Sequence, residues 1–259
     1  MVEAMIVLSG IQIFYLAGGL PAEEADVTVL YVHGNLGSSR WFEQAMDVAG
    51  ARTLALDMPN FGRSDRIETH SIPEYGEYVV EFIEAVAARP VVLVGHSLGG
   101  AVSMAVATSR PDLVAGLVLV DSAPVDGLVT PDAYHPAIEA YREDEAQLRA
   151  ALKSVVPTLE DGAWFDRIVE DARRMKGEAY VGHAVELGKA DFTAVADRYD
   201  GPALVVRGGL DALVTSEMTE RTAKAFGAEV VEFAHVGHSV MAEDPTAFVG
   251  LVEDFAGGL

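Results

Sequence analysis

Cysteine is absent from the 259-residue sequence. Its absence excludes disulfide bonds, thiolate metal sites and a cysteine nucleophile, so covalent catalysis would have to use another side chain. Positive charge is scarce as well, because 18 lysine and arginine residues stand against 40 aspartate and glutamate residues, for a formal net charge of −22. This negative charge repels nucleic acid and anionic membrane surfaces, and we expect neither as a partner.

Long apolar runs are also missing from the sequence. No stretch approaches the roughly 20 residues of a membrane-spanning helix, and the first residues lack the basic segment that begins a signal peptide. We therefore expect a cytoplasmic protein that does not insert into membranes. Half of the residues are nonetheless apolar, which at this length predicts one large globular domain with a sizeable core.

The most informative stretch of the sequence is 91–101, which reads VVLVGHSLGGA. Its first four residues favour a buried strand, and the small residues from Ser97 onward favour a helix that stops before Pro111. A strand that passes into a helix with almost no loop requires a tight turn, which Gly95 and Gly99 permit. In this context the pattern Gly-x-Ser-x-Gly indicates a nucleophile elbow with Ser97 as the nucleophile. The alternative is a glycine-rich turn in which the serine only caps the helix.

Strands and helices alternate along most of the chain. Predicted strands occupy 5–8, 11–16, 27–32, 52–56, 91–94, 117–120, 203–207 and 230–233. Predicted helices occupy the segment from Ser38 or Ser39 through Val48, 74–88, 97–109, 217–226 and the segment from about 246 onward. The first two strands are joined by a tight turn and predict an antiparallel edge. The remaining alternation predicts an α/β fold in which helices cover both faces of a parallel sheet.

The alternation breaks between 122 and 201, where roughly eighty residues show helical patterns and no convincing strand. We expect a helical lid inserted into a core formed by 1–121 and 202–259, because the insertion leaves the sheet at the carboxyl end of a strand, where ligands bind. The stretch from Thr158 to Asp161 fits the start of a helix. Four lid side chains are candidates to face a substrate, although such residues more often pack in a core: Trp164, Phe165, Tyr180 and His183.

Asp211 and His238 each lie in the turn just past the carboxyl end of a predicted strand, at the same edge of the sheet as Ser97. A serine hydroxyl is a poor nucleophile at neutral pH, so it needs an imidazole to remove its proton and a carboxylate to orient that imidazole. Ser97, His238 and Asp211 supply these three groups. Asp121 also ends a predicted strand and is an alternative acid, and His235 is an alternative base.

A second glycine-bearing loop, HGNLG at 33–37, follows another predicted strand. Acyl transfer requires an oxyanion hole, and the hole requires a backbone N–H from outside the elbow. We predict that this donor is the amide of Asn35, with the amide of Leu98 as its partner and Leu36 as the alternative to Asn35. We expect His33 to form structural hydrogen bonds rather than to take part in catalysis.

Together these segments resemble the ordered signature of the α/β-hydrolase superfamily over essentially the whole chain. The segments that carry the resemblance are His33-Gly34-Asn35, Asp57 to Asp65, Gly95 to Gly100, Gly208 to Asp211 and Gly237-His238. The resemblance implies an eight-stranded, mostly parallel sheet, a Ser97, His238 and Asp211 triad, an oxyanion hole from Asn35 and Leu98, and a structural loop at 57–65. Haloalkane dehalogenases and epoxide hydrolases of this superfamily have an aspartate at the elbow, so Ser97 argues against both reactions.

We therefore expect a serine hydrolase that cleaves a small to medium carboxylic ester or lactone through an acyl-enzyme. Water is the only second substrate, so no cofactor is implied, and the scattered acids and absent thiolates predict no metal. Carbon–carbon bond hydrolysis and cofactor-free perhydrolysis use the same triad and are alternatives, as is a ligand receptor of this fold. Basic lid residues that could bind a substrate carboxylate would favour carbon–carbon cleavage, and those available are Arg142, Arg149, Lys153, Arg173 and Arg174.

Overall fold

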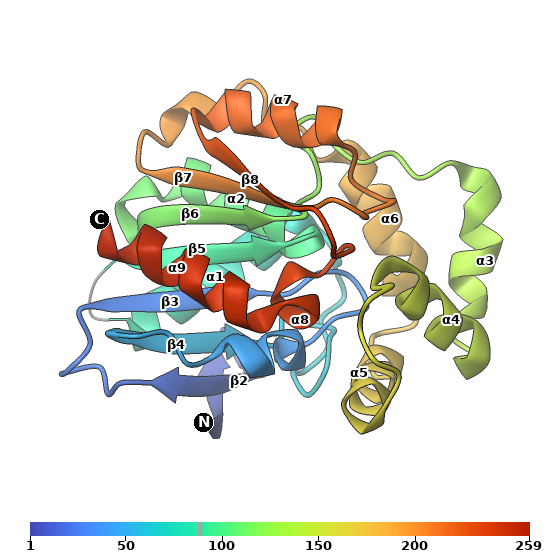
Figure 1. The fold of residues 1–259 in the computed structure, drawn as a ribbon. Coiled ribbons are helices and arrows are strands. Elements are labelled where there is room, and N and C mark those ends of the chain that lie inside the picture. Colours follow the sequence, from blue (N-terminus) through green and yellow to red (C-terminus); the bar gives the residue numbers. More distant parts are fainter. Residues whose placement is uncertain (88–89) are drawn as a thin grey trace.

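The computed structural model describes residues 1–87 and 90–259. The strands are β1 (Val2–Leu8), β2 (Ile11–Gly19), β3 (Val27–Val32), β4 (Ala51–Leu56), β5 (Val91–His96), β6 (Val114–Val120), β7 (Ala203–Gly208) and β8 (Glu229–Phe233). Within the described residues these eight strands form one sheet in the order β1-β2-β4-β3-β5-β6-β7-β8 (Figure 1). Strand β2 pairs antiparallel with β1 and with β4, and the other pairings among the described strands are parallel. The predicted mostly parallel, eight-stranded sheet is confirmed.

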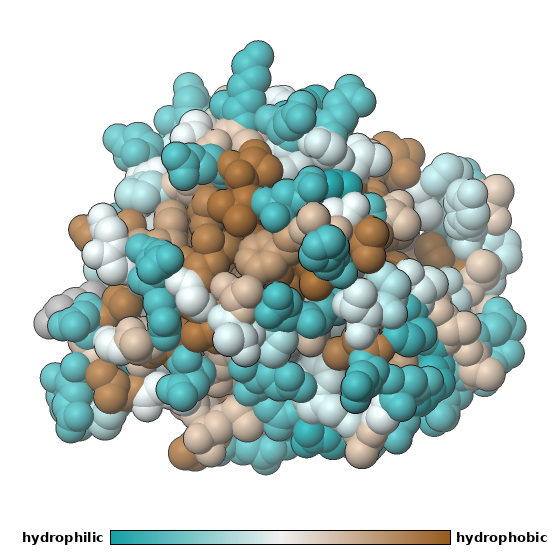
Figure 2. Space-filling model, viewed as in Figure 1, coloured by the Kyte–Doolittle hydropathy of each residue, from teal (hydrophilic) through white to brown (hydrophobic). Residues whose placement is uncertain are grey.

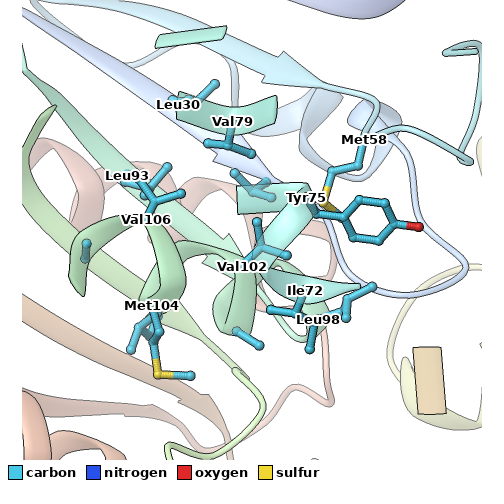
Figure 3. Close-up of a cluster of buried hydrophobic side chains, with 14 of the residues drawn as sticks. Leu30, Met58, Ile72, Tyr75, Val79, Leu93, Leu98, Val102, Met104 and Val106 are labelled. Carbon is cyan, nitrogen blue, oxygen red and sulfur yellow. The ribbon is translucent and has the colours of Figure 1, made fainter. Parts of the chain in front are cut away.

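Helices cover both faces of the sheet, as the sequence predicted. One face packs against α1 (Ile72–Val86), α2 (Leu98–Ser109) and α7 (Ser216–Phe226), and the other against the 3₁₀-helix η1 (Ser39–Ala45), α8 (Val240–Glu243) and α9 (Pro245–Gly257). Every residue of β5 is buried, because a strand covered on both faces has no solvated side. Figure 3 shows part of the first core, with Leu30 and Leu93 on the sheet and Val79 and Val102 on the helices.

Two of these predicted helices have bounds that differ from the structure by more than one residue. The segment after Ser38 is a 3₁₀-helix that ends at Ala45, so the predicted helix through Val48 is wrong in both type and length. Helix α1 begins at Ile72, two residues before the predicted start, because Pro73 in its first turn lacks an N–H that would have no partner there. The predicted end of this helix at Ala88 lies outside the described residues.

The insertion between β6 and β7 contains four α-helices and no strand, and the structure describes every residue from 122 to 201. These helices are α3 (His135–Ala140), α4 (Glu145–Val155), α5 (Ala163–Arg173) and α6 (Ala179–Lys189). They lie together at the carboxyl ends of the parallel strands (Figure 1). We propose that 122–201 is the lid and that 1–121 and 202–259 form the core.

The predicted helix start at Thr158 is wrong, since α5 begins at Ala163 after Gly162. The Thr158 N–H and hydroxyl both donate to Glu243 Oε2, at 3.1 and 2.5 Å. Thr158 is therefore used in a contact between the lid and the segment before α9, and it cannot cap a helix.

A buried ion pair also holds the lid against the core. Asp171 of α5 accepts hydrogen bonds from the Ser38 hydroxyl at 2.9 Å and from Nε of Arg40 at 2.8 Å. Asp171 is buried, and a buried charge is stable only when it is paired and hydrogen-bonded in this way. The contact fixes α5 next to the loop 33–37.

The face of the molecule seen in Figure 2 is hydrophilic around its rim. An apolar area lies between α7 and α9, the region of the edge strand β8, whose Val230 is 44% exposed. In the described part of the chain, no helix combines the length and the apolar composition needed to cross a membrane.

Candidate active site

Ser97 is the one residue between β5 and α2, so the strand passes into the helix without a loop. Its backbone has φ 53° and ψ −116°, a conformation that is unfavourable for a residue with a side chain. Two hydrogen bonds hold it there, from the Ser97 N–H to Val120 O at 3.1 Å and from the Gly100 N–H to Ser97 O at 2.9 Å. The turn places Ser97 in the wall of a pocket of about 360 Å³.

Glycine at position 99 lets this elbow approach β3. A β-carbon on Gly99 would overlap the carbonyl oxygens of Val32 and His33, which are backbone atoms that cannot rotate away. The elbow is therefore packed against the neighbouring strand at closer range than any other residue type allows.

We predict that Gly99→Ala lowers the free energy of unfolding by about 2–3 kcal/mol, the usual cost of overpacking a close contact. Gly250→Ala is the matched control, because a β-carbon at Gly250 in α9 meets open space and alanine favours a helix by about 0.5–1 kcal/mol. Urea unfolding of both variants measures the two effects. Equal stability of the two variants would show that the contact at Gly99 is not tight.

His238 and Asp211 meet at the same edge of the sheet as Ser97. His238 Nδ1 donates to Asp211 Oδ2 at 2.8 Å, and the Leu213 N–H donates to Asp211 Oδ1 at 2.7 Å. Ser97 and His238 line the same pocket. No hydrogen bond joins the Ser97 hydroxyl to another group among the described residues, so the structure brings the serine and the histidine to one cavity without bonding them.

The main chain of His238 is held from two sides. Its N–H donates to Val155 O at the end of lid helix α4 at 2.7 Å, and its carbonyl accepts from His96 Nε2 at 2.8 Å. Burial lowers the pKa of His96 to about 3, so this ring stays neutral and its Nε2–H can donate. Apart from the place of His96 in the elbow pattern, no sequence signal predicts this role.

Asp121, the alternative acid, makes no hydrogen bond to His238 within the described structure. Its Oδ1 accepts from the Gly208 N–H at 2.7 Å, and its buried Oδ2 has no hydrogen-bond partner among the described residues. Burial raises the pKa of this carboxyl group. Among the described residues, Asp121, Asp211 and His238 are the one group with metal-ligand spacing, but Asp211 and His238 already bond each other. The geometry favours Asp211 as the acid.

The loop 33–37 follows β3 and reaches the same pocket. Leu36 has φ 56°, and its N–H donates to the side-chain Oδ1 of Asn35 at 3.0 Å. The Leu36 amide, the alternative oxyanion donor, is therefore already engaged. In residues 1–87 and 90–259, the amides of Asn35 and Leu98 donate no hydrogen bond. Both N–H groups are therefore available to an oxyanion.

His33 and the loop 57–65 form structural hydrogen bonds beside the loop 33–37, as the sequence predicted. His33 is buried. Its Nδ1 donates to the carbonyl oxygen of Gly34 at 2.8 Å, and its Nε2 accepts from the Met58 N–H at 3.0 Å. Burial lowers the pKa of His33 to about 4, so the ring is neutral. Asp57 accepts from the N–H groups of Ser39 at 2.7 Å and Arg63 at 2.8 Å, which ties the loop 57–65 to η1.

A comparison of the chain with known protein families now decides its family. The sequence pattern of the alpha/beta hydrolase family matches residues 29–251. The chain belongs to the alpha/beta hydrolase family. The match confirms the resemblance inferred from the motifs.

This alpha/beta hydrolase is 29% identical to the dihydrolipoyllysine-residue acetyltransferase component of the acetoin cleaving system of Cupriavidus necator, with 97% of this chain and 68% of that protein aligned. It is 26% identical to a pimeloyl-acyl-carrier-protein methyl ester esterase of Neisseria meningitidis, with 89% of this chain and 93% of that protein aligned. An esterase structure from Exiguobacterium antarcticum superposes with a TM-score of 0.87 at 17% identity, covering 99% of this chain and 100% of that one. The structural match shows the shared fold.

The pocket of this hydrolase is lined by uncharged side chains and two histidines. The lid contributes Thr130, Tyr134, Ile138, Tyr141, Ala151, Leu152, Ser154 and Val155, and the core contributes Trp41, Leu213, Ser239 and the loop and elbow residues. None of the four lid candidates lines this pocket. Phe165, Tyr180 and His183 are buried, and Trp164 donates to Glu43 Oε2 at 2.8 Å.

The charge state of His238, which we propose as the general base, predicts how the rate of ester hydrolysis depends on pH. Burial lowers the pKa of His238, but the hydrogen bond and charge of Asp211 outweigh burial and raise the pKa above its usual 6.5. A general base must be unprotonated, so kcat/KM is expected to fall as the pH drops through this raised pKa. An ester assay from pH 5 to 9 checks this, and an acid limb centred below pH 6 would contradict it.

Proposed function

We propose that this alpha/beta hydrolase is a serine hydrolase that cleaves an uncharged, small to medium carboxylic ester or lactone. The observation that carries the proposal is the set of groups around one pocket. Ser97 is held in a strained elbow, His238 is paired with Asp211 at 2.8 Å, and the amides of Asn35 and Leu98 have no acceptor among the described residues. Nucleophile, base, acid and oxyanion donors are the parts that acyl transfer requires.

In the proposed reaction, His238 Nε2 takes the hydroxyl proton while Ser97 Oγ attacks the carbonyl carbon. The amides of Asn35 and Leu98 donate to the oxyanion, and each donor lowers the barrier by about 3 kcal/mol. The carbon–oxygen bond to the alcohol breaks as His238 returns the proton to the leaving oxygen. Water, deprotonated by His238, then attacks the acyl-enzyme and releases the acid and the serine. Asp211 keeps the imidazole oriented and stabilises its charged form.

The lining of the pocket supports an uncharged substrate. Among the described residues, no lysine, arginine, aspartate or glutamate lines the pocket. A charged group entering the pocket would lose its hydration without gaining a counter-ion, which disfavours its binding. Of the basic lid residues that could have favoured carbon–carbon cleavage, the four arginines are paired with acids: Arg142 with Glu139 and Glu143, Arg149 with Asp161 and Asp166, Arg173 with Glu145, and Arg174 with Glu170. Lys153 instead donates to backbone carbonyl oxygens, those of Val156, Pro157 and Leu159.

A series of p-nitrophenyl esters from acetate to dodecanoate tests the proposal. We expect turnover at about 1–10³ s⁻¹ for the best ester and a decline for chains too long for the pocket. A fluorophosphonate probe should label Ser97, as located by peptide mass spectrometry. An ester of matched length that ends in a carboxylate is the control for charge, and we expect its kcat/KM to be at least about tenfold lower.

Two outcomes would overturn this function. If folded protein turns over none of the esters, the reaction is not ester hydrolysis. A single turnover that leaves a stable complex would indicate a receptor of this fold. Equal kcat/KM for the neutral and the charged ester would refute the proposal that the substrate is uncharged. It would leave the proposed ester hydrolysis standing.

A further inference from the structure

His183 of lid helix α6 lies directly behind the loop 33–37, which carries the proposed oxyanion donor Asn35. The ring is fully buried and stacks on Phe61, with the ring centroids 4.8 Å apart and the planes 9° from parallel. Its Nδ1 is 2.8 Å from Asn35 Oδ1, and its Nε2 is 2.8 Å from the hydroxyl of Tyr75. Asn35 lines the pocket whereas His183 does not, so the histidine acts behind the residue that faces the substrate.

Hydrogen bonds link Asn60, Tyr75, His183 and Asn35 in that order. At one end of this chain, Asn60 determines which atom of each pair donates. Its Oδ1 accepts from the Ile67 N–H at 2.9 Å, and its Nδ2 donates to Thr69 O at 2.6 Å and to the Tyr75 hydroxyl at 3.0 Å. The Tyr75 oxygen therefore accepts from Asn60, and the tyrosine proton is directed to His183 Nε2. A ring nitrogen that accepts is unprotonated, so the ring proton of His183 is on Nδ1.

Asn35 fixes the same arrangement from the other end. Its Oδ1 accepts from the Leu36 N–H at 3.0 Å, so this atom is an oxygen acceptor and His183 Nδ1 must donate to it. The two ends give the same tautomer independently. Burial lowers the pKa of His183 to about 3, which keeps every member of this hydrogen-bonded chain neutral near pH 7.

We propose that His183 is a positioning residue that holds the Asn35 carboxamide through Nδ1–H and thereby aims the Asn35 amide at the oxyanion. The inference rests on the proposed serine hydrolase function. The carboxamide of Asn35 also holds Leu36 in its left-handed conformation at φ 56°. Without His183 the carboxamide can rotate and release Leu36, and the loop can then turn the Asn35 amide away from the pocket. The lid would thus complete the oxyanion hole as well as cover the site.

Two substitutions of His183 separate positioning from packing. In His183→Asn the side-chain nitrogen lies where Nδ1 was and can still donate to Asn35. In His183→Gln the nitrogen lies near the former Nε2 and reaches Tyr75 instead. Both variants lose the ring that stacks on Phe61, so both should lose similar stability.

We expect kcat of His183→Gln for the best p-nitrophenyl ester to fall by about 10–100-fold, part of the effect of losing one oxyanion donor. The KM should change less than about threefold, because this donor acts mainly in the transition state. His183→Asn should keep kcat within about fivefold of the wild type. Equal losses in both folded variants, or no loss in either, would overturn the proposal.

A second measurement does not depend on hydrolysis. In protein labelled with ¹⁵N-histidine, the His183 ring should carry its proton on Nδ1 and stay neutral from pH 5 to 9, with His183→Gln identifying its signals. The Leu36 amide should exchange with solvent at least about tenfold faster in His183→Gln than in wild type or His183→Asn. A proton on Nε2, or unchanged exchange, would refute the role of His183. Ester turnover by the wild type separately decides the proposed function.

Discussion

Ser97→Ala is expected to lower kcat for the best p-nitrophenyl ester by about 10⁵-fold or more. In the proposed mechanism the variant lacks the oxygen that forms the acyl-enzyme, and only binding and the oxyanion hole would support the residual rate. Initial rates with and without prior inhibition by a fluorophosphonate exclude a contaminating esterase.

Ser154→Ala is the matched control for this substitution. Ser154 lines the same pocket from the lid, but its hydroxyl donates to Ala151 O at 2.7 Å within its own helix. We expect its kcat within about threefold of the wild type, since no bond to Ser154 forms or breaks in the reaction. If Ser97→Ala retained the activity of Ser154→Ala, the proposed nucleophile would be wrong.

Asp211→Asn is expected to lower kcat by about 10⁴-fold, because an asparagine at this position no longer selects the correct tautomer of His238. Loss of the carboxylate charge should also lower the pKa of His238, so the acid limb of kcat/KM moves to lower pH. Steady-state kinetics from pH 5 to 9 measure both effects.

Asp121→Asn discriminates between the two candidate acids. Asp121 accepts from the Gly208 N–H and makes no bond to His238 in the described structure, so we expect kcat to fall less than about tenfold. The reverse order of the two effects would show that Asp121 is the acid. Equal large losses would show that the two carboxyl groups act as a unit with His238.

The parts of the fold that depend on neighbours in the sequence were predictable. Apolar runs and glycine-rich turns place Ser97, Asp211 and His238 at strand ends, and the structure brings these ends to one edge of the sheet. Parallel strands make this outcome general, because their carboxyl ends must lie together.

Features that depend on distant contacts were not predictable. Thr158 fits a helix start, but its hydroxyl and its N–H donate hydrogen bonds to Glu243, which lies 85 residues away. His183 reads as an ordinary lid residue, since its partner Asn35 lies 148 positions earlier. No local pattern connects such pairs, and each is decided by how the lid packs on the core.

The backbone of this site has a consequence for attempts to stabilise the protein. Leu36, Ser97 and Asp121 are non-glycine residues with φ of 56°, 53° and 42°, and all three follow strands at the catalytic edge. Each such conformation costs about 1–3 kcal/mol, against a total stability of about 5–15 kcal/mol for a typical domain. Selection of a mutant library for heat resistance alone would draw these positions toward glycine, which relieves the strain. At position 97 that gain would remove the proposed nucleophile, so at this edge of the sheet we expect thermostability and turnover to select for different residues.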